Sequence, residues 1–460
     1  MSAALTSPAR RVSTFVPRKR RGAELFLLIL ALVIGVGAYA LVGLGRDDAI
    51  PTDIFEYGGG LIILGIICHV VVRVVAAYAD PVILPAVVAL NGLGLAMIRR
   101  LDLASNTSFA SQQLVWGALS IAGFVATLVV VRDHRRLQSY TYTMGFAGVV
   151  LLLLPLVPGL GVNINGAQIW IRLGGLSFQP GEVAKLCLAI FFAGYLVVKR
   201  DALALAGKRF LGIDLPRGRD LGPILVMWLV SLGVLVFQRD LGSSLLFFGL
   251  FVVLLYVATE RPSWLVVGAA LFAGGAYFGY LTFGHVQTRV DGWLHPFEDT
   301  DRYGQIIQGQ YSLAWGGILG RGLGEGSPYL TPFSYSDFIG TSLGEELGVT
   351  GLMAVIVIYG IIVERGLRTS LVCRDPFGKL LAVGLSIAFA LQVFVVLGGV
   401  TKLIPLTGLT TPFLSYGGSS LIANWVMVAL IIRVSDHARR PAPVLTPTAP
   451  DDETAVVKLR

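Results

Sequence analysis

Long apolar runs separated by short polar connectors dominate this chain of 460 residues. Each run has about 17 to 24 residues, the length at which an α-helix crosses the hydrocarbon core of a bilayer. We therefore expect an all-α, polytopic integral membrane protein with about 12 transmembrane helices. The expected spans cover residues 23–44, 57–77, 81–98, 114–131, 141–160, 183–198, 221–237, 242–258, 264–283, 341–363, 378–400 and 413–433.

The composition agrees with this pattern. Hydrophobic residues make up 55% of the chain and charged residues only 14%, whereas a soluble domain carries roughly a quarter charged residues. The net charge of +8 does not indicate nucleic-acid binding, because the excess lies mainly in short connectors, as membrane topology requires. The three cysteines Cys68, Cys187 and Cys373 form no recognisable framework, and no zinc motif is present. The sequence therefore predicts neither disulfides nor a metal cluster.

The distribution of Lys and Arg predicts the orientation. The tail 1–22, the connectors 132–136, 199–219 and 364–379, and the segment after Arg433 are basic and would share one side. We expect that side to be the cytoplasm, with both termini there and residues 434–460 disordered. Arg99 and Arg100 are the exception, on the opposite side. The polar segments 161–182 and 284–340 would then face outwards from the cytoplasmic membrane.

Residues 284–340 form a large extracytoplasmic loop in this interpretation. Loops of this length are usually functional or disordered, and the many aromatic residues argue against disorder. Glu298, Asp299 and Asp301 lie almost side by side. Clustered carboxylates can supply a general base or bind a divalent cation, although a merely solvated acidic loop has the same composition. The glycine-rich run 320–326 fits no phosphate-binding pattern, and we interpret it as a flexible turn.

Four further polar groups fall on the same expected face. Glu182 and Lys185 share a helix face at the mouth of a span, and Asp240 lies in a tight turn between two spans. Glu345 and Glu346 are adjacent at the start of another span, so we expect one of them to face the interior. The segment from Lys402 to Ser420 is broken by Pro and Gly, and such irregular backbone is tolerated at membrane depth where it lines a cavity.

These motifs resemble the SEDS (shape, elongation, division and sporulation) family of cell-wall glycosyltransferases, most closely its RodA branch. The resemblance covers roughly residues 140–433, which we take as the family core, with extra N-terminal helices and the start of the core at 23–139. The motifs read NINGAQIWIRLGGLSFQPGEVAKL, FQRDLGSSLL, RVDGWLHPFED, SDFIGTSLGEELG and LIPLTGLTTPFLSYGGSSL.

The resemblance implies a peptidoglycan glycosyltransferase that polymerises lipid II, the undecaprenyl-diphosphate-linked disaccharide-peptide, into glycan strands during cell elongation. It also implies a class B penicillin-binding protein as partner. The family's essential loop aspartate corresponds to Asp299, which would deprotonate the acceptor hydroxyl. Asp301 competes for that role, because EDTDRYGQ departs from the family's usual loop pattern.

The expected site combines residues from the resemblance with cations suited to a diphosphate leaving group. A divalent cation, Mg²⁺ or Mn²⁺, could also be held by Asp299 and Glu298. Membrane lipid, but not nucleic acid, is an expected partner. The expected substrate-binding residues are Trp170, Gln179, Glu182, Lys185, Asp240, Arg289, Lys402 and Ser415.

Other functions fit the same spans. A division-type, FtsW-like polymerase would perform the same chemistry with another partner. A lipid II flippase would need alternating access and polar residues on both faces, whereas the motifs concentrate on one. A solute transporter lacks support because no inverted repeat is visible, and a non-catalytic scaffold would have a dispensable Asp299.

Overall fold

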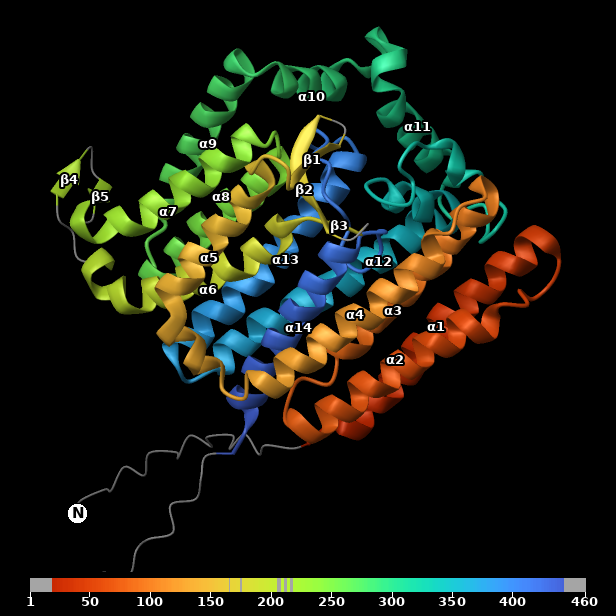
Figure 1. Cartoon of the computed structure of the whole chain (residues 1–460), viewed down its shortest axis with the longest axis horizontal. Coiled ribbons are helices and arrows are strands. Elements are labelled where there is room, and N and C mark those ends of the chain that lie inside the picture. Colours follow the sequence, from red (N-terminus) through yellow and green to blue (C-terminus); the bar gives the residue numbers. More distant parts are fainter. Residues whose placement is uncertain are drawn as a thin grey trace, which may run out of the picture.

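The computed structural model describes residues 19–441 except 165, 174–175, 205–207, 211–212 and 216–217. In this part the chain is mainly helical (Figure 1). The helices are α1 (Arg21–Asp47), α2 (Ile54–Val75), α3 (Ile83–Ser105), α4 (Phe109–Val130), α5 (Thr141–Leu153), α6 (Pro180–Ala204), α7 (Gly218–Phe237), α8 (Leu241–Thr259), α9 (Ser263–Thr282), α10 (Gly284–Leu294), α11 (Thr300–Gly316), α12 (Ile339–Val372), α13 (Pro376–Val400) and α14 (Gly418–Arg439).

Eleven segments of the described chain are long and apolar enough to cross a membrane. One of them joins α5 to its flanking 3-10 turns η1 (His134–Tyr140) and η2 (Leu154–Leu156). The one expected span that is not among these eleven, 221–237, lies in α7, whose described apolar stretch is Leu225–Val234. The all-α polytopic fold predicted from hydrophobic periodicity is therefore confirmed.

Several predicted ends were wrong. The last span begins at Gly418 rather than 413, because Thr411 to Gly417 form an irregular turn. Its helix continues to Arg439, so the expected disordered tail does not begin at 434. Residues 1–18 and 442–460, where most of both predicted tails fall, lie outside the described residues.

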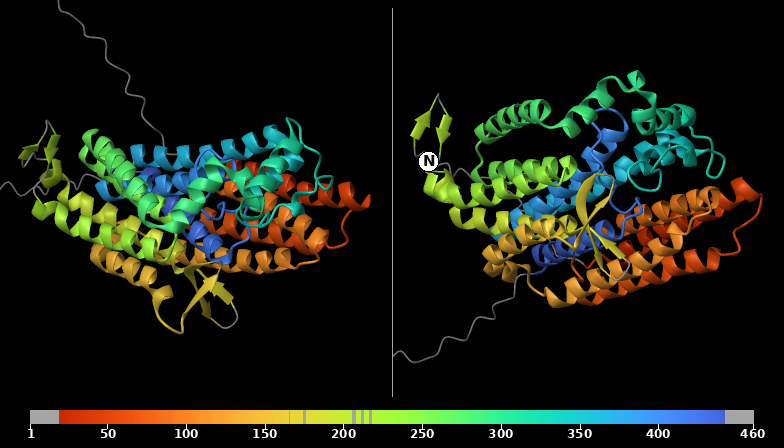
Figure 2. Two further views of the ribbon diagram at one scale, coloured as in Figure 1. Left: turned by 90° about the horizontal axis from the view of Figure 1, so that it is seen from above. Right: turned by 45° about the horizontal axis from the view of Figure 1, so that its top comes forward.

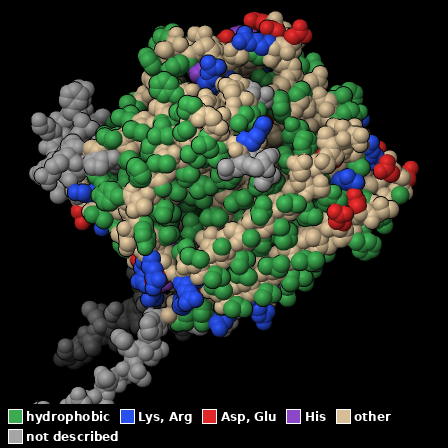
Figure 3. Space-filling model, in the orientation of Figure 1, with side chains coloured by type: hydrophobic (Ala, Val, Ile, Leu, Met, Phe, Trp, Pro, Cys, Tyr) green, Lys and Arg blue, Asp and Glu red, His purple; other side chains and the backbone are tan. Residues whose placement is uncertain are grey.

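The bundle has a buried centre and an apolar outer surface. Helices α3, α6, α13 and α14 are buried over most of their length, whereas α9 is almost entirely exposed. Around the centre, α1 packs along α3, α4 along α14, and α5 along α6 (Figure 2). Hydrophobic side chains cover the middle of the molecule, while Lys and Arg gather at its lower left and acidic residues at its top and right (Figure 3). This distribution is typical of a protein that spans a bilayer.

The two ends of the bundle differ. Arg21 at the start of α1 interacts electrostatically with Asp436 near the end of α14, so both ends of the described chain share what we name the terminal face. Arg439 Nη2 lies 3.0 Å from Asp80 Oδ2 on this face. Helices α10 and α11 lie at the opposite end, which we name the loop face (Figure 1).

The terminal face contains its own buried ionic network, so buried polar side chains are not confined to the face where the sequence motifs gather. Glu24 is fully buried between Arg21 and His69, whose Nδ1 lies 2.8 Å from the Glu24 carboxylate. Arg433 and Asp436, both buried in α14, lie 3.7 Å apart. Polarity on both faces weakens one argument that the sequence offered against a lipid II flippase.

The segment 284–340 is mostly helical rather than an extended loop. Besides α10 and α11 it contains the 3-10 turns η3 (Pro296–Glu298) and η4 (Pro328–Leu330). In Figures 1 and 2 helix α10 lies across the loop face and α11 leads from it toward α12. The indole Nε1 of Trp293 donates to the Lys402 carbonyl (2.9 Å), which attaches α10 to the irregular segment before α14.

The glycine-rich run 320–326 is an ordered turn, not the flexible one predicted. The backbone N–H groups of Arg321 and Gly322 donate to the carbonyls of Glu345 and Glu346 at 3.0 and 2.9 Å. Both glutamates are buried, although only one was expected to be. The turn covers one side of α12, and the carboxylates of Glu345 and Glu346 therefore find hydrogen-bond partners in the turn.

Arg100 and Arg99 form the basic pair on the loop face, and the structure gives both of them carboxylate partners. The Arg100 guanidinium lies 2.8 Å from the Glu346 carboxylate, and both side chains are buried. Arg99 pairs with Asp53 at 2.5 Å. These arginines are therefore neutralised inside the fold and do not contradict the topology drawn from the remaining Lys and Arg residues.

Short strands form the remaining regular structure. The antiparallel strands β1 (Gly161–Ile164), β2 (Ala167–Leu173) and β3 (Leu176–Phe178) lie between α5 and α6. A second pair, β4 (Lys208–Phe210) and β5 (Ile213–Leu215), lies between α6 and α7. The first sheet leads directly into Pro180, the first residue of α6, where proline costs no intrahelical hydrogen bond.

Candidate active site

Lys185 is the centre of a buried polar cluster near the start of α6. Its Nζ lies 2.5 Å from Glu182 Oε2, one turn earlier on the same helix. It also lies 2.7 Å from Gln392 Oε1 in α13 and 3.2 Å from Asn424 Oδ1 in α14. An ammonium has three donors, so all three are used. We name these four side chains the Lys185 cluster.

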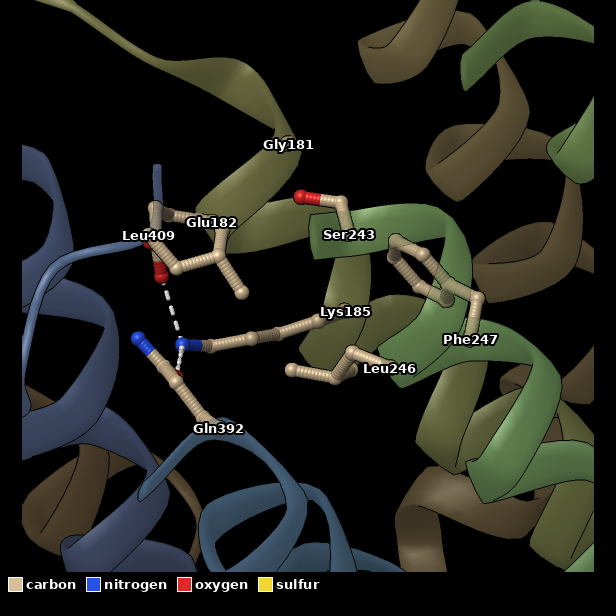
Figure 4. A pocket seen from close by; sticks show the side chains of 8 residues that line it. All are labelled: Gly181, Glu182, Lys185, Ser243, Leu246, Phe247, Gln392 and Leu409. Carbon is tan, nitrogen blue, oxygen red and sulfur yellow. Dashed lines mark hydrogen bonds and ion pairs between the residues drawn. The ribbon is translucent and has the colours of Figure 1, made fainter. Parts of the chain in front are cut away.

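The cluster borders a small pocket between three helices (Figure 4). Figure 4 shows Lys185 reaching from α6 toward Glu182 and Gln392, with Ser243 of α8 across the pocket. The amide of Gln392 also donates to the Thr410 carbonyl (3.1 Å), and Asn424 donates to Ser420 Oγ (3.1 Å). The pocket lining consists of Gly181, Glu182, Lys185, Ser243, Leu246, Phe247, Gln392 and Leu409.

Asp240, Arg289 and Asp337 form a second charged group. Asp240 caps α8 by accepting from the Ser243 backbone N–H at 2.9 Å, which also joins it to the pocket wall. Arg289, on α10, interacts electrostatically with both carboxylates. Its Nη1 donates to the Leu406 carbonyl at 2.6 Å. The arginine thus brings together segments that lie far apart in the sequence.

Burial has the largest effect on the pKa values of the Asp240 and Asp337 carboxylates. It raises the pKa of Asp240 above the usual range, against the opposing effects of the Ser243 hydrogen bond and Arg289. Burial likewise raises the pKa of Asp337 from 3.8 to about 6, although Ser336 and Arg289 act in the other direction. Titratable groups perturbed in this way are common at functional sites.

Asp299 lies apart from the two charged groups, on the surface. Its side chain is exposed and caps α11, with Oδ1 accepting from the Arg302 backbone N–H at 3.0 Å. Glu298 and Asp301 are exposed as well, and a Glu298 oxygen lies 3.7 Å from His295 Nδ1. Among the described residues, no third His, Cys, Asp or Glu ligand atom converges on the Glu298 and Asp299 carboxylates.

The remaining expected binding residues have mixed positions. Trp170 is partly buried in β2, opposite Val162 of β1. Gln179 is buried directly before α6, and its carbonyl accepts from the Glu182 N–H at 3.2 Å. Lys402 contributes its carbonyl to Trp293, as described above.

Ser415 stabilises the turn before α14. Its buried hydroxyl accepts from the Thr411 backbone N–H at 2.8 Å and donates to the Ser336 carbonyl at 2.6 Å. These bonds connect the irregular turn to the segment that begins α12. The side chain expected to bind substrate is therefore engaged in the fold, and it does not line the pocket beside Lys185.

Sequence reasoning missed two members of the site. Gln392 and Asn424 complete the Lys185 cluster, whereas Asp337, which faces Arg289, belongs to the SDFIG motif that the sequence singled out. A signal for the two amides was available: each is a strongly polar side chain within an apolar span, and such residues are often functional. Their partner could not be named, because 207 residues separate Gln392 from Lys185 along the chain.

Comparisons with known proteins place this geometry in context. The family model described as "Cell cycle protein", for FtsW, RodA and SpoVE, matches residues 57–440. The chain is 49% identical to "Peptidoglycan glycosyltransferase RodA" of Mycobacterium tuberculosis (strain ATCC 25618 / H37Rv), over 92% of each chain. It is 34% identical to "Probable peptidoglycan glycosyltransferase FtsW" of Geobacter metallireducens, over 78% of this chain and 95% of that one.

A solved structure has the same arrangement of helices. Its description is "Structural coordination of polymerization and crosslinking by a peptidoglycan synthase complex". The likeness has a TM-score of 0.62 at 28% identity and covers 78% of this chain and 98% of the other. The family match begins inside α2, so it includes more of the N-terminal half than the motifs after residue 140 indicated.

Proposed function

Because the chain belongs to the FtsW, RodA and SpoVE family, we propose that it is a RodA-type peptidoglycan glycosyltransferase that polymerises lipid II on the outer face of the cytoplasmic membrane. The 49% identity to a RodA protein, against 34% to an FtsW protein, favours the elongation role over the division role. The loop face is then the outer face, and both termini are cytoplasmic, in agreement with the basic connectors.

The Lys185 cluster carries this proposal at the level of the site. A lysine held by three oxygen atoms beside a pocket is a cation whose position is fixed before substrate arrives. Preorganised charge of this kind stabilises the negative charge that develops on a leaving diphosphate. The Glu182 carboxylate offsets part of the positive charge of Lys185. Arg289 therefore supplies a second cation, and its guanidinium can bind two phosphate oxygens at once.

The proposed chemistry is a displacement at the anomeric carbon of the growing chain. A hydroxyl oxygen of the acceptor lipid II attacks that carbon, and the bond to the undecaprenyl diphosphate breaks. The acceptor's proton passes to the Asp299 carboxylate, and the diphosphate leaves with the bonding electron pair. Asp299 is suited to this role because it is exposed and is positioned by its hydrogen bond from Arg302.

Two further components belong to the proposal. A class B penicillin-binding protein would cross-link the product, in keeping with the polymerization and crosslinking complex to which the fold is similar. A divalent cation, Mg²⁺ or Mn²⁺, would neutralise the diphosphate and be held by Asp299 and Glu298, the exposed carboxylates next to η3. Lipid would surround the apolar belt.

The direct experiment is polymerisation of purified lipid II by the detergent-solubilised protein with its partner, with and without Mg²⁺ or Mn²⁺. Asp299→Asn should abolish polymer, because an amide cannot accept the proton. Asn is as good a helix cap as Asp, so the fold should survive. Asp301→Asn is the matched control and should keep activity. Full activity in Asp299→Asn would reject Asp299 as the base, and inactivity of the wild type would redirect attention to flipping or scaffolding.

A further inference from the structure

Three side chains with metal-binding atoms meet on the terminal face, far from the proposed active site. They are His134 in η1, and Cys373 and Asp375 in the connection between α12 and α13. His134 Nε2 lies 3.0 Å from Asp375 Oδ2, and Cys373 Sγ lies 3.1 Å from the same oxygen. In tetrahedral zinc sites, bonds of about 2.0–2.3 Å place neighbouring ligand atoms roughly 3.3–3.7 Å apart. The spacing is close to that geometry.

Gly378 lies directly against the three atoms and has no side chain to press on them. A Cβ on Gly378 would lie 2.5 Å from His134 Nε2, 2.7 Å from Asp375 Oδ2 and 2.7 Å from Cys373 Sγ. Such contacts are too close for a carbon atom, so any larger residue at 378 would push the three side chains out of their present arrangement.

His134 provides an independent observation. Its ring is fully buried, and its Nδ1 has no hydrogen-bond partner among the described residues. That nitrogen lies 4.0 Å from Asp133 Oδ1. Histidines that bind metal through one ring nitrogen commonly direct the other N–H toward a carboxylate. Coordination through Nε2 would place the ring proton on Nδ1, facing Asp133.

From this geometry we propose that His134, Cys373 and Asp375 bind a divalent transition-metal ion of the zinc class. Thiolate, imidazole and carboxylate together suit zinc rather than Mg²⁺ or Ca²⁺, which prefer oxygen ligands. Three protein ligands leave a fourth tetrahedral position for water. The ion would join the α4–α5 connection to the α12–α13 connection, two segments 241 residues apart in sequence.

Binding at this site must release a proton. In the metal-free protein the Cys373 thiol donates to Asp375 Oδ2 at 3.1 Å. When the sulfur–metal bond forms, the S–H proton leaves to solvent, because only the thiolate is a ligand. Lys379 lies near enough to favour the thiolate, and Arg135 is close to both Cys373 and Asp375. These cations offset the two anionic ligands.

Cobalt substitution in the purified, full-length protein tests the site, because Co²⁺ bound to thiolate absorbs through a sulfur-to-metal charge-transfer band. After chelation and addition of Co²⁺, wild-type protein should bind about one ion and show this band. Cys373→Ser should abolish the band, yet its hydroxyl can still donate to Asp375 and keep the fold. Cys187→Ser, the matched control, should retain the band. His134→Gln should weaken binding by at least about tenfold.

A second measurement does not depend on variants. Zn²⁺ added to metal-free wild type should raise its unfolding temperature progressively with the Zn²⁺ concentration, because a ligand of the native state stabilises it. Absence of both metal uptake and this rise would overturn the proposal, as would a charge-transfer band that persists in Cys373→Ser. In either case the three side chains would form only a hydrogen-bonded cap of α13.

Discussion

Lys185 gains its proposed role from a charge that the fold holds in place. Glu182, Gln392 and Asn424 each contribute an oxygen atom within 3.2 Å of its ammonium. Burying such a charge without partners would be prohibitive, so the cluster must stay intact for the helices to pack. Function and stability are consequently linked at this residue.

Lys185→Met should destabilise the protein by about 3–5 kcal/mol, because Glu182 would remain buried without its cation. Replacing both residues, as Glu182→Gln with Lys185→Met, should recover much of the lost stability but no polymerase activity. Unfolding temperature in detergent and polymerisation of lipid II measure the two effects. Recovery of activity in the double variant would show that the cation is not needed for catalysis.

Asp337 should make stability depend on pH. Its pKa in the fold is about 6 instead of 3.8, mainly because of burial. Protons are therefore bound more tightly in the folded state, and this residue's favourable contribution is present at low pH and lost as the pH rises from about 4 through about 6.

Comparison of wild type with Asp337→Asn isolates this contribution, since the amide does not titrate. Relative to the variant, wild type should lose stability between about pH 4 and pH 6 and remain constant above that range. The difference in unfolding temperature across this interval is the measurement. Parallel pH curves for the two proteins would mean that Asp337 titrates normally.

At the level of elements, α12 owes its buried glutamates to a break in the helix. Gly348 has φ 71° and ψ −176°, a conformation that residues other than glycine rarely adopt. The backbone of the turn that precedes α12 packs closely against Gly348. The Thr350 N–H donates to the Ile318 carbonyl, and the Val349 N–H donates to the Gly317 carbonyl. This arrangement places the turn 316–327 over Glu345 and Glu346.

Gly348→Ala should be strongly destabilising. A Cβ would lie 2.3 Å from Gly320 N and 2.4 Å from the Ile318 carbonyl, and the backbone strain alone costs on the order of 1–3 kcal/mol. Gly360→Ala, on the same helix but facing open space, should instead stabilise by about 0.5–1 kcal/mol. Thermal unfolding of the two variants tests the contrast. Equal effects would remove the special role assigned to the break.

At the scale of the whole molecule, the central proposal concerns the orientation of the protein across the membrane. The buried ionic network of the terminal face and the acidic loop face are chemically different ends of one bundle. Only the bias of Lys and Arg assigns one of them to the cytoplasm. That assignment also places Asp299 on the side where lipid II would be polymerised.

Cysteine labelling in intact cells tests the direction. A membrane-impermeant maleimide should modify Glu325→Cys on the loop face but not Arg136→Cys on the terminal face, and both positions are exposed. Wild type serves as the background, since Cys68 and Cys373 are buried and the partly buried Cys187 lies within the apolar helix α6. After the cells are broken, both variants should react. The reverse pattern would invert the topology and with it the proposed function.

The sequence by itself determined the membrane architecture and indicated several residues of the candidate site. Hydrophobic runs fix spans because every backbone polar group in lipid must be satisfied inside a helix, and this constraint needs no knowledge of tertiary contacts. Glu182, Lys185 and Asp240 were identified in the same way, as charges at the ends of apolar runs. Lys185 and Glu182 were paired correctly because three residues of helix bring them to one face.

Only the tertiary structure decided which distant residues meet. Gln392 and Asn424 join Lys185, and His134 joins Cys373 and Asp375, through packing of helices that local patterns do not specify. The same packing bonded the Ser415 hydroxyl within a turn and kept Asp299 exposed. Periodicity records which face of a helix is apolar, whereas the partner of a buried polar atom depends on how several helices cross.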